Sequence, residues 1–245
     1  MMDLIKENKD NLTALWKLAG KKANAFHTNN KFDLVSVNYS EWPNRLWFHE
    51  AITEESLNTA MSNFIDAPSK LIVPYWNIYK SKTEQLLVNQ GFKVQFGQVG
   101  MSLKLEKPFD FQPHLKLKIV EHESSAELWS KLFKSAFNYL IHPKLLMLCK
   151  EEINFFIAYA KDQPVGTAAL FSNNKKVVGI HSVGVIPEMR RKGYAEDIML
   201  QLLNLSIESK YEYTTLQASV MGKGLYLKLG FVEQFEIRNY VYNPN

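Results

Sequence analysis

The chain has 245 residues, of which 46% are hydrophobic and 13% aromatic, and its formal net charge is +4. This length suits two domains of ordinary size, and the apolar content is enough to bury a core, which excludes an intrinsically disordered chain. The positive charge is mild and scattered, and its densest run is only Arg190-Arg191-Lys192, so no nucleic-acid partner is predicted.

Membrane, disulfide and metal features are sparse in the sequence. No apolar run approaches the length of about 18 residues that a membrane span needs, so no membrane partner is predicted. The single cysteine, Cys149, leaves no internal disulfide, and the six histidines do not show zinc-ligand spacing. These observations predict a soluble cytoplasmic protein without a metal site.

The segment 107–113 is the best candidate for a linker. It carries two prolines, Pro108 and Pro113, and has no periodic pattern. We therefore expect two domains: an accessory or degenerate domain at 1–110, and a second domain at 115–245.

The pattern after this linker alternates between strand and helix periods. Alternating residues predict a strand at 115–119, and a serine cap precedes an amphipathic helix that is expected to reach Leu140. The elements predicted next are a hairpin of strands 153–159 and 165–171, a strand 177–185 stopped by Pro187, a helix 195–205, a strand 214–219, a short helix 222–229 and a closing strand 231–242. This order predicts an α/β fold with helices on both faces of a mixed sheet.

The two halves of the chain end alike. Gly91-Phe92 and Gly230-Phe231 each begin the pattern Gly-Phe-x-x-Gln-Phe, after an apolar helical stretch and before an extended segment. The match is either chance or the mark of an internal duplication. The first half has no counterpart of the basic run at 190–192, so as a duplicate it is expected to lack a cofactor of its own.

Residues 183–195 pass from a strand through a turn into a helix. The first turn of a helix has backbone N–H groups without internal partners, and its dipole favours negative charge. Gly193 and Ala195 leave room for a phosphate to approach the backbone, and three cations lie beside them. The pattern indicates an anion site, such as one for a pyrophosphate, although a solvated basic helix start is the simpler alternative.

The run from Arg190 to Ala195 resembles the acetyl-CoA signature of GNAT-type N-acetyltransferases, Gln/Arg-x-x-Gly-x-Gly/Ala, with Arg190 in place of the commoner glutamine. The strand Leu216-Gln217-Ala218-Ser219 and the later Leu229-Gly230-Phe231 resemble the family's downstream elements, so the resemblance covers 115–245. It implies a mixed, mostly antiparallel splayed sheet with acetyl-CoA as cofactor. The pyrophosphate is expected on the signature loop and the pantetheine arm beside the preceding strand. The cofactor-binding residues that this implies are Val183, Val185, Arg190, Arg191, Lys192, Gly193, Tyr194, Ala195 and Ser219.

The resemblance also implies catalytic roles. Tyr226 lies where GNAT enzymes with a tyrosine acid place it, so it is expected to protonate the departing thiolate, unless it merely packs. His181 lies two residues before Val183 and is expected on the same strand face, where it would be the general base, although a lone strand histidine is more often structural. Ser219 is expected either to contact the pantetheine or to cap the following helix.

These features predict an N-acetyltransferase that moves an acetyl group from acetyl-CoA to a primary amine of a small molecule or protein. The alternative is a catalytically silent domain that binds coenzyme A as a sensor or scaffold. A dinucleotide-binding domain is disfavoured because Gly-x-Gly-x-x-Gly is absent. The tryptophans Trp42, Trp47 and Trp76 could line an acceptor pocket, but a core position is the more common one.

Overall fold

A computed structural model gives the fold of residues 2–65, 67, 70–79 and 83–243. The helices are α1 (Leu4–Lys22), α2 (Glu54–Ile65), α3 (Glu84–Asn89), α4 (Glu123–Phe137), α5 (Pro143–Cys149), α6 (Tyr194–Glu208) and α7 (Lys223–Lys228). The strands are β1 (Phe26–Thr28), β2 (Phe32–Val35), β3 (Arg45–Phe48), β4 (Ile72–Trp76), β5 (Phe92–Lys104), β6 (Leu115–Ile119), β7 (Ile153–Ala160), β8 (Gln163–Phe171), β9 (Val177–Val185), β10 (Tyr213–Ser219) and β11 (Val232–Tyr242).

One mixed sheet runs through the whole molecule. The strand order is β1-β2-β3-β4-β11-β5-β10-β9-β8-β7-β6, and most neighbours are antiparallel. The parallel pairs are β3 with β4 and β9 with β10. The predicted α/β class, with a mostly antiparallel sheet, is confirmed.

The N-terminal half repeats the fold of the C-terminal half. Strands β1 to β4 pair antiparallel, antiparallel and then parallel, and strands β7 to β10 pair in the same sequence. Helix α2 links the first parallel pair, and α6 links the second. The duplication that the two Gly-Phe endings suggested is therefore present in the topology.

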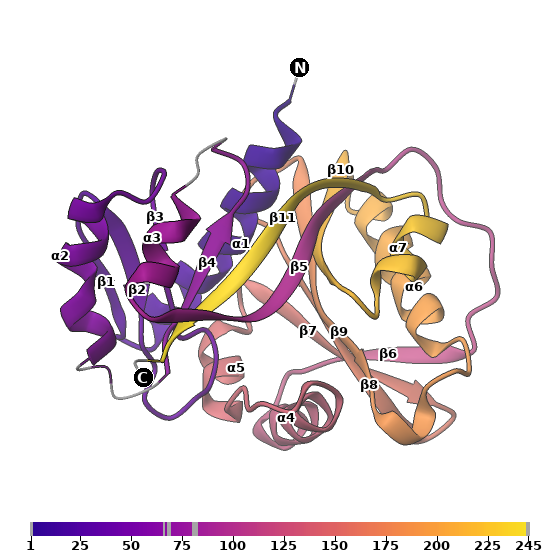
Figure 1. The fold of residues 1–245 in the computed structure, drawn as a ribbon. Coiled ribbons are helices and arrows are strands. Elements are labelled where there is room, and N and C mark those ends of the chain that lie inside the picture. The colour runs from indigo at the N-terminus through magenta and orange to yellow at the C-terminus, as the bar shows by residue number, and fades with distance from the viewer. Residues whose placement is uncertain (1, 66, 68–69, 80–82, 244–245) are drawn as a thin grey trace.

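The final strands of the two halves are exchanged. Strand β5 ends the first half but pairs with β10 of the second, and β11 ends the second half but pairs with β4 of the first. The two exchanged strands also pair with each other along most of their length. In Figure 1 the yellow β11 and the magenta β5 run together between the two halves. The sheet is thereby continuous across the segment 107–113, which contains neither helix nor strand.

Helices cover both faces of the sheet. On one face α4, α5 and part of α1 enclose a core around Trp129, Phe133 and Leu146, while α6 and α7 pack on the opposite face around Ile198 and Leu202. Helix α1, which belongs to the N-terminal half, also contributes Leu12 and Trp16 to a further core in that half. No helix in the described part of the chain combines the length and the apolar content that a membrane crossing requires.

The helix predicted to reach Leu140 is shorter than expected. Helix α4 ends at Phe137 because Asn138 adopts the left-handed conformation, with φ of 63°, and its N–H bonds to the Lys134 carbonyl. A separate helix, α5, then begins at Pro143, a residue well suited to a first helical position. Helix α5 was not predicted from the sequence, although His142 caps it through its ring nitrogen.

The strand exchange predicts that the two halves do not fold separately. A fragment of residues 115–245 would lose β5, which leaves the edge of β10 bare and removes both partners of β11. We expect fragments 1–110 and 115–245 to be aggregated or unfolded when expressed alone, and to form a 1:1 complex with native-like circular dichroism when co-expressed. A monomeric 115–245 fragment that melts cooperatively would contradict this expectation.

Candidate cofactor and active site

The parallel strands β9 and β10 part from each other midway. Their ladder runs from the pair Tyr213–Val177 to the pair Thr215–Gly179 and then stops. Both strands continue beyond it, to Val185 and Ser219, but are held from their outer sides by β8 and β5. Beyond Gly179, the main-chain groups of β9 and β10 that face each other are therefore not bonded to one another and are left for another partner. We call this opening between the two strands the V.

A β-bulge at Ser182 determines which way the side chains of β9 point. Ser182 has φ of 55°, and the register with β8 shifts between the pairs Ala169–His181 and Thr167–Gly184. Because of the extra residue, Val183 and Val185 join the core beneath α6, whereas His181 faces α1. The expectation that His181 shares a face with Val183 and Val185 is wrong, since simple alternation does not hold across a bulge.

His181 is enclosed beneath α1. Its side chain is 9% exposed, and Nε2 lies 2.9 Å from Oδ1 of Asn11. Burial lowers the pKa of His181 to about 4, so the ring is neutral at pH 7. A neutral ring held by an amide in the core is a structural contact between α1 and β9.

The loop between β9 and α6 presents unpaired backbone N–H groups. Arg191 and Gly193 both adopt the left-handed region, with φ of 63° and 78°. Within the described residues, no backbone carbonyl accepts a bond from the N–H groups of positions 191–195. A Cβ placed on Gly193 would meet no atom within 4 Å, so the space above this backbone is open. This arrangement can accept a phosphate through its N–H groups and the positive end of α6.

The three cations of the loop differ in their roles. Arg190 donates from Nε to the Val185 carbonyl at 3.1 Å and from Nη2 to the Ala136 carbonyl at 3.0 Å, so its guanidinium ties β9 to the end of α4. Arg191 and Lys192 are exposed. The charge available to an anion at the loop is therefore mainly that of Arg191 and Lys192.

Ser219 is the last residue of β10, and Tyr226 lies on the helix that follows, α7. Tyr226, on α7, is partly buried against the core beneath α6, and its ring meets Phe231 edge-on at 5.8 Å. Burial raises the pKa of its hydroxyl to about 12, which keeps the group protonated near neutrality. The Ser219 hydroxyl accepts a bond from the Gly222 N–H at 3.2 Å and so supports the turn that leads into α7.

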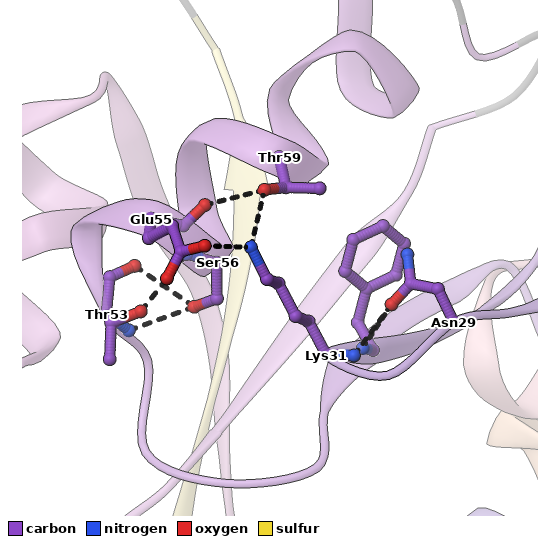
Figure 2. A network of polar contacts seen from close by, with 7 residues as sticks. Asn29, Lys31, Thr53, Glu55, Ser56 and Thr59 are labelled. Carbon is purple, nitrogen blue, oxygen red and sulfur yellow. Dashed lines mark hydrogen bonds and ion pairs between the residues drawn. The ribbon is translucent and has the colours of Figure 1, made fainter.

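The equivalent helix start in the N-terminal half is closed. Helix α2 occupies the place of α6, but the Thr53 hydroxyl accepts from the Ser56 N–H at 3.1 Å, and the Ser56 hydroxyl accepts from the Thr53 N–H at 2.9 Å. Figure 2 shows this reciprocal cap beside Glu55, whose carboxylate binds Lys31 at 2.6 Å. A start that is capped and carries acidic residues in its first turn repels a phosphate rather than binding it.

Two asparagines of α1 were missed in the sequence. Both are fully buried; Asn8 donates to the Met101 and Leu216 carbonyls, and Asn11 donates to the Phe171 carbonyl. Together they link α1 to both arms of the V. The sequence contained an indication of this role, because Asn8 and Asn11 share a helical face with apolar residues, where a buried polar side chain needs a hydrogen-bond partner.

Comparison with known proteins agrees with this arrangement. A family model described as "Acetyltransferase (GNAT) domain" matches residues 123–240. No curated protein matches the chain.

Solved structures with the same fold cover most of this chain, including its N-terminal half. A GCN5-related N-acetyltransferase from Kribbella flavida is 13% identical, with a TM-score of 0.73 over 98% of this chain and 96% of its own. A GCN5-related N-acetyltransferase from Sphaerobacter thermophilus is 14% identical, with a TM-score of 0.65 over 92% and 85%. A tandem GNAT protein from the clavulanic acid biosynthesis pathway is 9% identical, with a TM-score of 0.58 over 87% and 79%.

The parted strands, the open loop at the start of α6 and the family match fall on the same segment of the chain. Residues 123–240 therefore belong to the GNAT family of acetyltransferase domains.

Proposed function

We propose that the protein is an acetyl-CoA-dependent N-acetyltransferase that acts on a primary amine. The observation that carries this proposal is the V between β9 and β10, which leads directly to the open backbone around Gly193. The unpaired N–H groups at 191–195 would hold the pyrophosphate, and Arg191 and Lys192 would add charge. Bound acetyl-CoA would supply an activated acetyl thioester to the site.

The parted edge of β9 supports a role in binding the pantetheine arm and the thioester. Beyond Gly179 its inward main-chain groups have no partner on β10, and the bulge at Ser182 turns the backbone locally. Inward N–H groups in this stretch can donate to the thioester oxygen as negative charge develops on it. Val183 and Val185 would supply main-chain contacts to the arm, because their side chains pack toward α6.

Tyr226, expected from the sequence to protonate the departing thiolate, is proposed as its hydrogen-bond donor. With a pKa of about 12, its hydroxyl is a weaker acid than an ordinary thiol, whose pKa is about 8.5. Complete proton transfer is therefore uphill, and the main contribution would be a hydrogen bond to the sulfur as the C–S bond breaks. Solvent would then supply the proton that the free thiol retains.

His181 is proposed as a positioning residue instead of the base. It faces away from Val183 and contacts Asn11, so its mechanical role is to hold α1 against β9 where the V opens. The amine must be neutral to attack, and solvent water would accept its proton.

One cofactor is expected for each chain. The capped and acidic start of α2 leaves the N-terminal half without the N–H groups that would hold a second pyrophosphate.

The loop assignment predicts the behaviour of Gly193→Glu. Wild type should bind acetyl-CoA with a stoichiometry of one by calorimetry, whereas Gly193→Glu should lose at least about tenfold in affinity through bulk and like charge. Gly193→Asn is the matched control, because asparagine tolerates positive φ and adds no charge, so it should retain more affinity. Equal affinity in wild type and Gly193→Glu would refute the loop assignment.

The proposed donor predicts a loss of turnover in Tyr226→Phe. Phenylalanine keeps the contact with Phe231 and removes only the hydroxyl, so kcat should fall by about 10- to 100-fold with little change in acetyl-CoA affinity. The control is Tyr211→Phe, a tyrosine that packs on the same core away from the V. Wild-type turnover in Tyr226→Phe would remove Tyr226 from the mechanism, and binding without turnover in wild type would support the sensor alternative.

The burial of His181 predicts acid-sensitive stability. The folded pKa of about 4 lies below the unfolded value of about 6.5, so the unfolded state takes up the proton first as pH falls. The free energy of unfolding should decrease between about pH 6.5 and 4, by up to about 3 kcal/mol. Urea titrations at several pH values measure this decrease. The variant His181→Asn should show a smaller decrease, whereas the control His27→Gln, at an exposed position, should show the same decrease as wild type.

A pH–rate profile then separates the two roles of His181. A positioning residue predicts the same profile shape in His181→Asn as in wild type, at a lower amplitude. Loss of one limb of the profile in this variant would restore His181 as the base.

A further inference from the structure

The β10 arm of the V carries a glutamine on the side of the sheet that α1 covers. Leu216 and Ala218 of this strand pack toward α6, so alternation turns Gln217 to the other side. There its Nε2 donates to Oδ1 of Asn8 at 2.7 Å. Gln217 comes two residues after Thr215, the last residue of β10 that pairs with β9. It therefore lies in the part of β10 that borders the opening.

The direction of the Gln217 amide is fixed by its neighbours. Asn8 donates through Nδ2 to two main-chain carbonyls, those of Met101 and Leu216, at 2.9 and 3.3 Å. A carbonyl only accepts, so the Asn8 amide cannot be flipped, and its Oδ1 must accept from Nε2 of Gln217. Gln98 also holds this strand, since its Nε2 donates to the Gln217 carbonyl at 3.4 Å. The Gln217 amide is therefore held with Nε2 toward Asn8 and Oε1 away from it.

Oε1 of Gln217 is an acceptor that the protein leaves open. It accepts no hydrogen bond within the described residues, and the side chain is only half-buried. The hydroxyls of Thr214 and Thr215, on the same strand, are sealed from solvent, whereas this oxygen is not. A fixed, accessible acceptor beside the opening can bind a ligand that donates a hydrogen bond.

The two arms of the V carry no charged side chain at neutral pH. Strands β9 and β10 contain no aspartate, glutamate, lysine or arginine, and their one histidine, His181, is neutral at pH 7. A carboxylate beside an amine would raise the pKa of the amine and hold it as the unreactive ammonium ion, an effect that is much smaller for a neutral amide oxygen. Gln217 can therefore bind an amine and leave it in the neutral form that attacks the thioester.

A primary amine has two hydrogens, which serve two purposes in the reaction. As its nitrogen forms the new C–N bond and the C–S bond breaks, one N–H proton leaves to solvent water and the other stays in the amide product. The departing thiolate takes up a proton from solvent. The hydrogen that stays can donate to Oε1 of Gln217 throughout. A secondary amine has only the hydrogen that leaves, so Gln217 would favour a primary amine.

We propose that Oε1 of Gln217 binds the acceptor amine in the V, that Asn8 is the positioning residue that orients it, and that the acceptor is a primary amine on an uncharged body. This inference rests on the proposed acetyl transfer, because it assigns the acceptor side of the same site. The first half of the chain then contributes to acceptor binding through α1, which supplies Asn8.

Two matched pairs of amines test the substrate class by thiol release from acetyl-CoA. Ethanolamine and 2-phenylethylamine differ from serine and phenylalanine only by the carboxylate beside the amine. The better of the two amines should have a kcat/KM at least about tenfold above that of its carboxylate-bearing partner and that of its own N-methyl analogue. Serine or phenylalanine as the better acceptor would overturn the uncharged acceptor, while the transferase would stand.

Gln217→Met tests the oxygen that binds the amine. Methionine keeps the length of the side chain and removes the acceptor, so KM for the better amine should rise about tenfold with kcat nearly unchanged. The preference for the primary over the N-methyl amine should fall by a similar factor, a change that a loss of stability alone would not produce. Gln95→Met, at an exposed glutamine of β5, is the matched control and should behave as wild type does.

Gln217→Glu places a carboxylate beside the bound amine. The amine should then keep its proton to higher pH, so the rise of kcat with pH should move upward by about one pH unit or more. Asn8→Ala removes the orienting bond, so the preference for the primary amine should fall in this variant too. Should Gln217→Met fail to fold, the pH profile of Gln217→Glu decides in its place.

An unchanged KM and primary-amine preference in a folded Gln217→Met, or an unshifted pH profile in Gln217→Glu, would overturn the proposal while leaving the transferase standing. Binding of acetyl-CoA without turnover of any amine would remove the transferase, and the role of Gln217 in binding an amine with it.

Discussion

The parting of β9 from β10 is the constraint on which the rest of the molecule depends. A parallel pair that separates leaves backbone groups without partners, and such groups are costly unless something compensates them. The structure stabilises the opening from outside: β8 and β5 hold the two arms, and α1 bridges them through Asn8 and Asn11.

The strand exchange makes the first half necessary to the GNAT domain in the second half. Strand β5 supplies the outer support of β10, so the V would lose one wall without it. Helix α1 also originates in the first half and covers the point where the strands part. The N-terminal half therefore supports the opening between β9 and β10, even though its own helix start is closed by Thr53 and Ser56.

Local patterns were readable from the sequence, while pairings between distant segments were not. The strand, loop and helix around Gly193 were predictable because glycine, cations and helical periodicity lie within a dozen positions. His181 was assigned to the wrong face because a bulge depends on the register with β8, which the sequence of β9 alone does not contain. The exchange of β5 and β11 escaped prediction for a related reason: both follow the same Gly-Phe ending, so each suits either neighbour. The orientation of Gln217 could not be predicted, since it depends on Asn8 of α1, 209 positions earlier in the chain.

The contrast between the starts of α2 and α6 has a consequence for the free protein. Helix caps typically contribute about 1 kcal/mol, and α2 has this contribution from its own side chains. Helix α6 has no side-chain cap at Gly193, so its first turn lacks that stabilisation until an anion binds. An anion bound to the loop would then slow amide hydrogen exchange in the first turn of α6 and leave α2 unaffected, because a ligand that binds only the folded state stabilises that state. The duplicated helix starts would thus divide one element into a copy that its own side chains cap and a copy whose first turn depends on a bound anion.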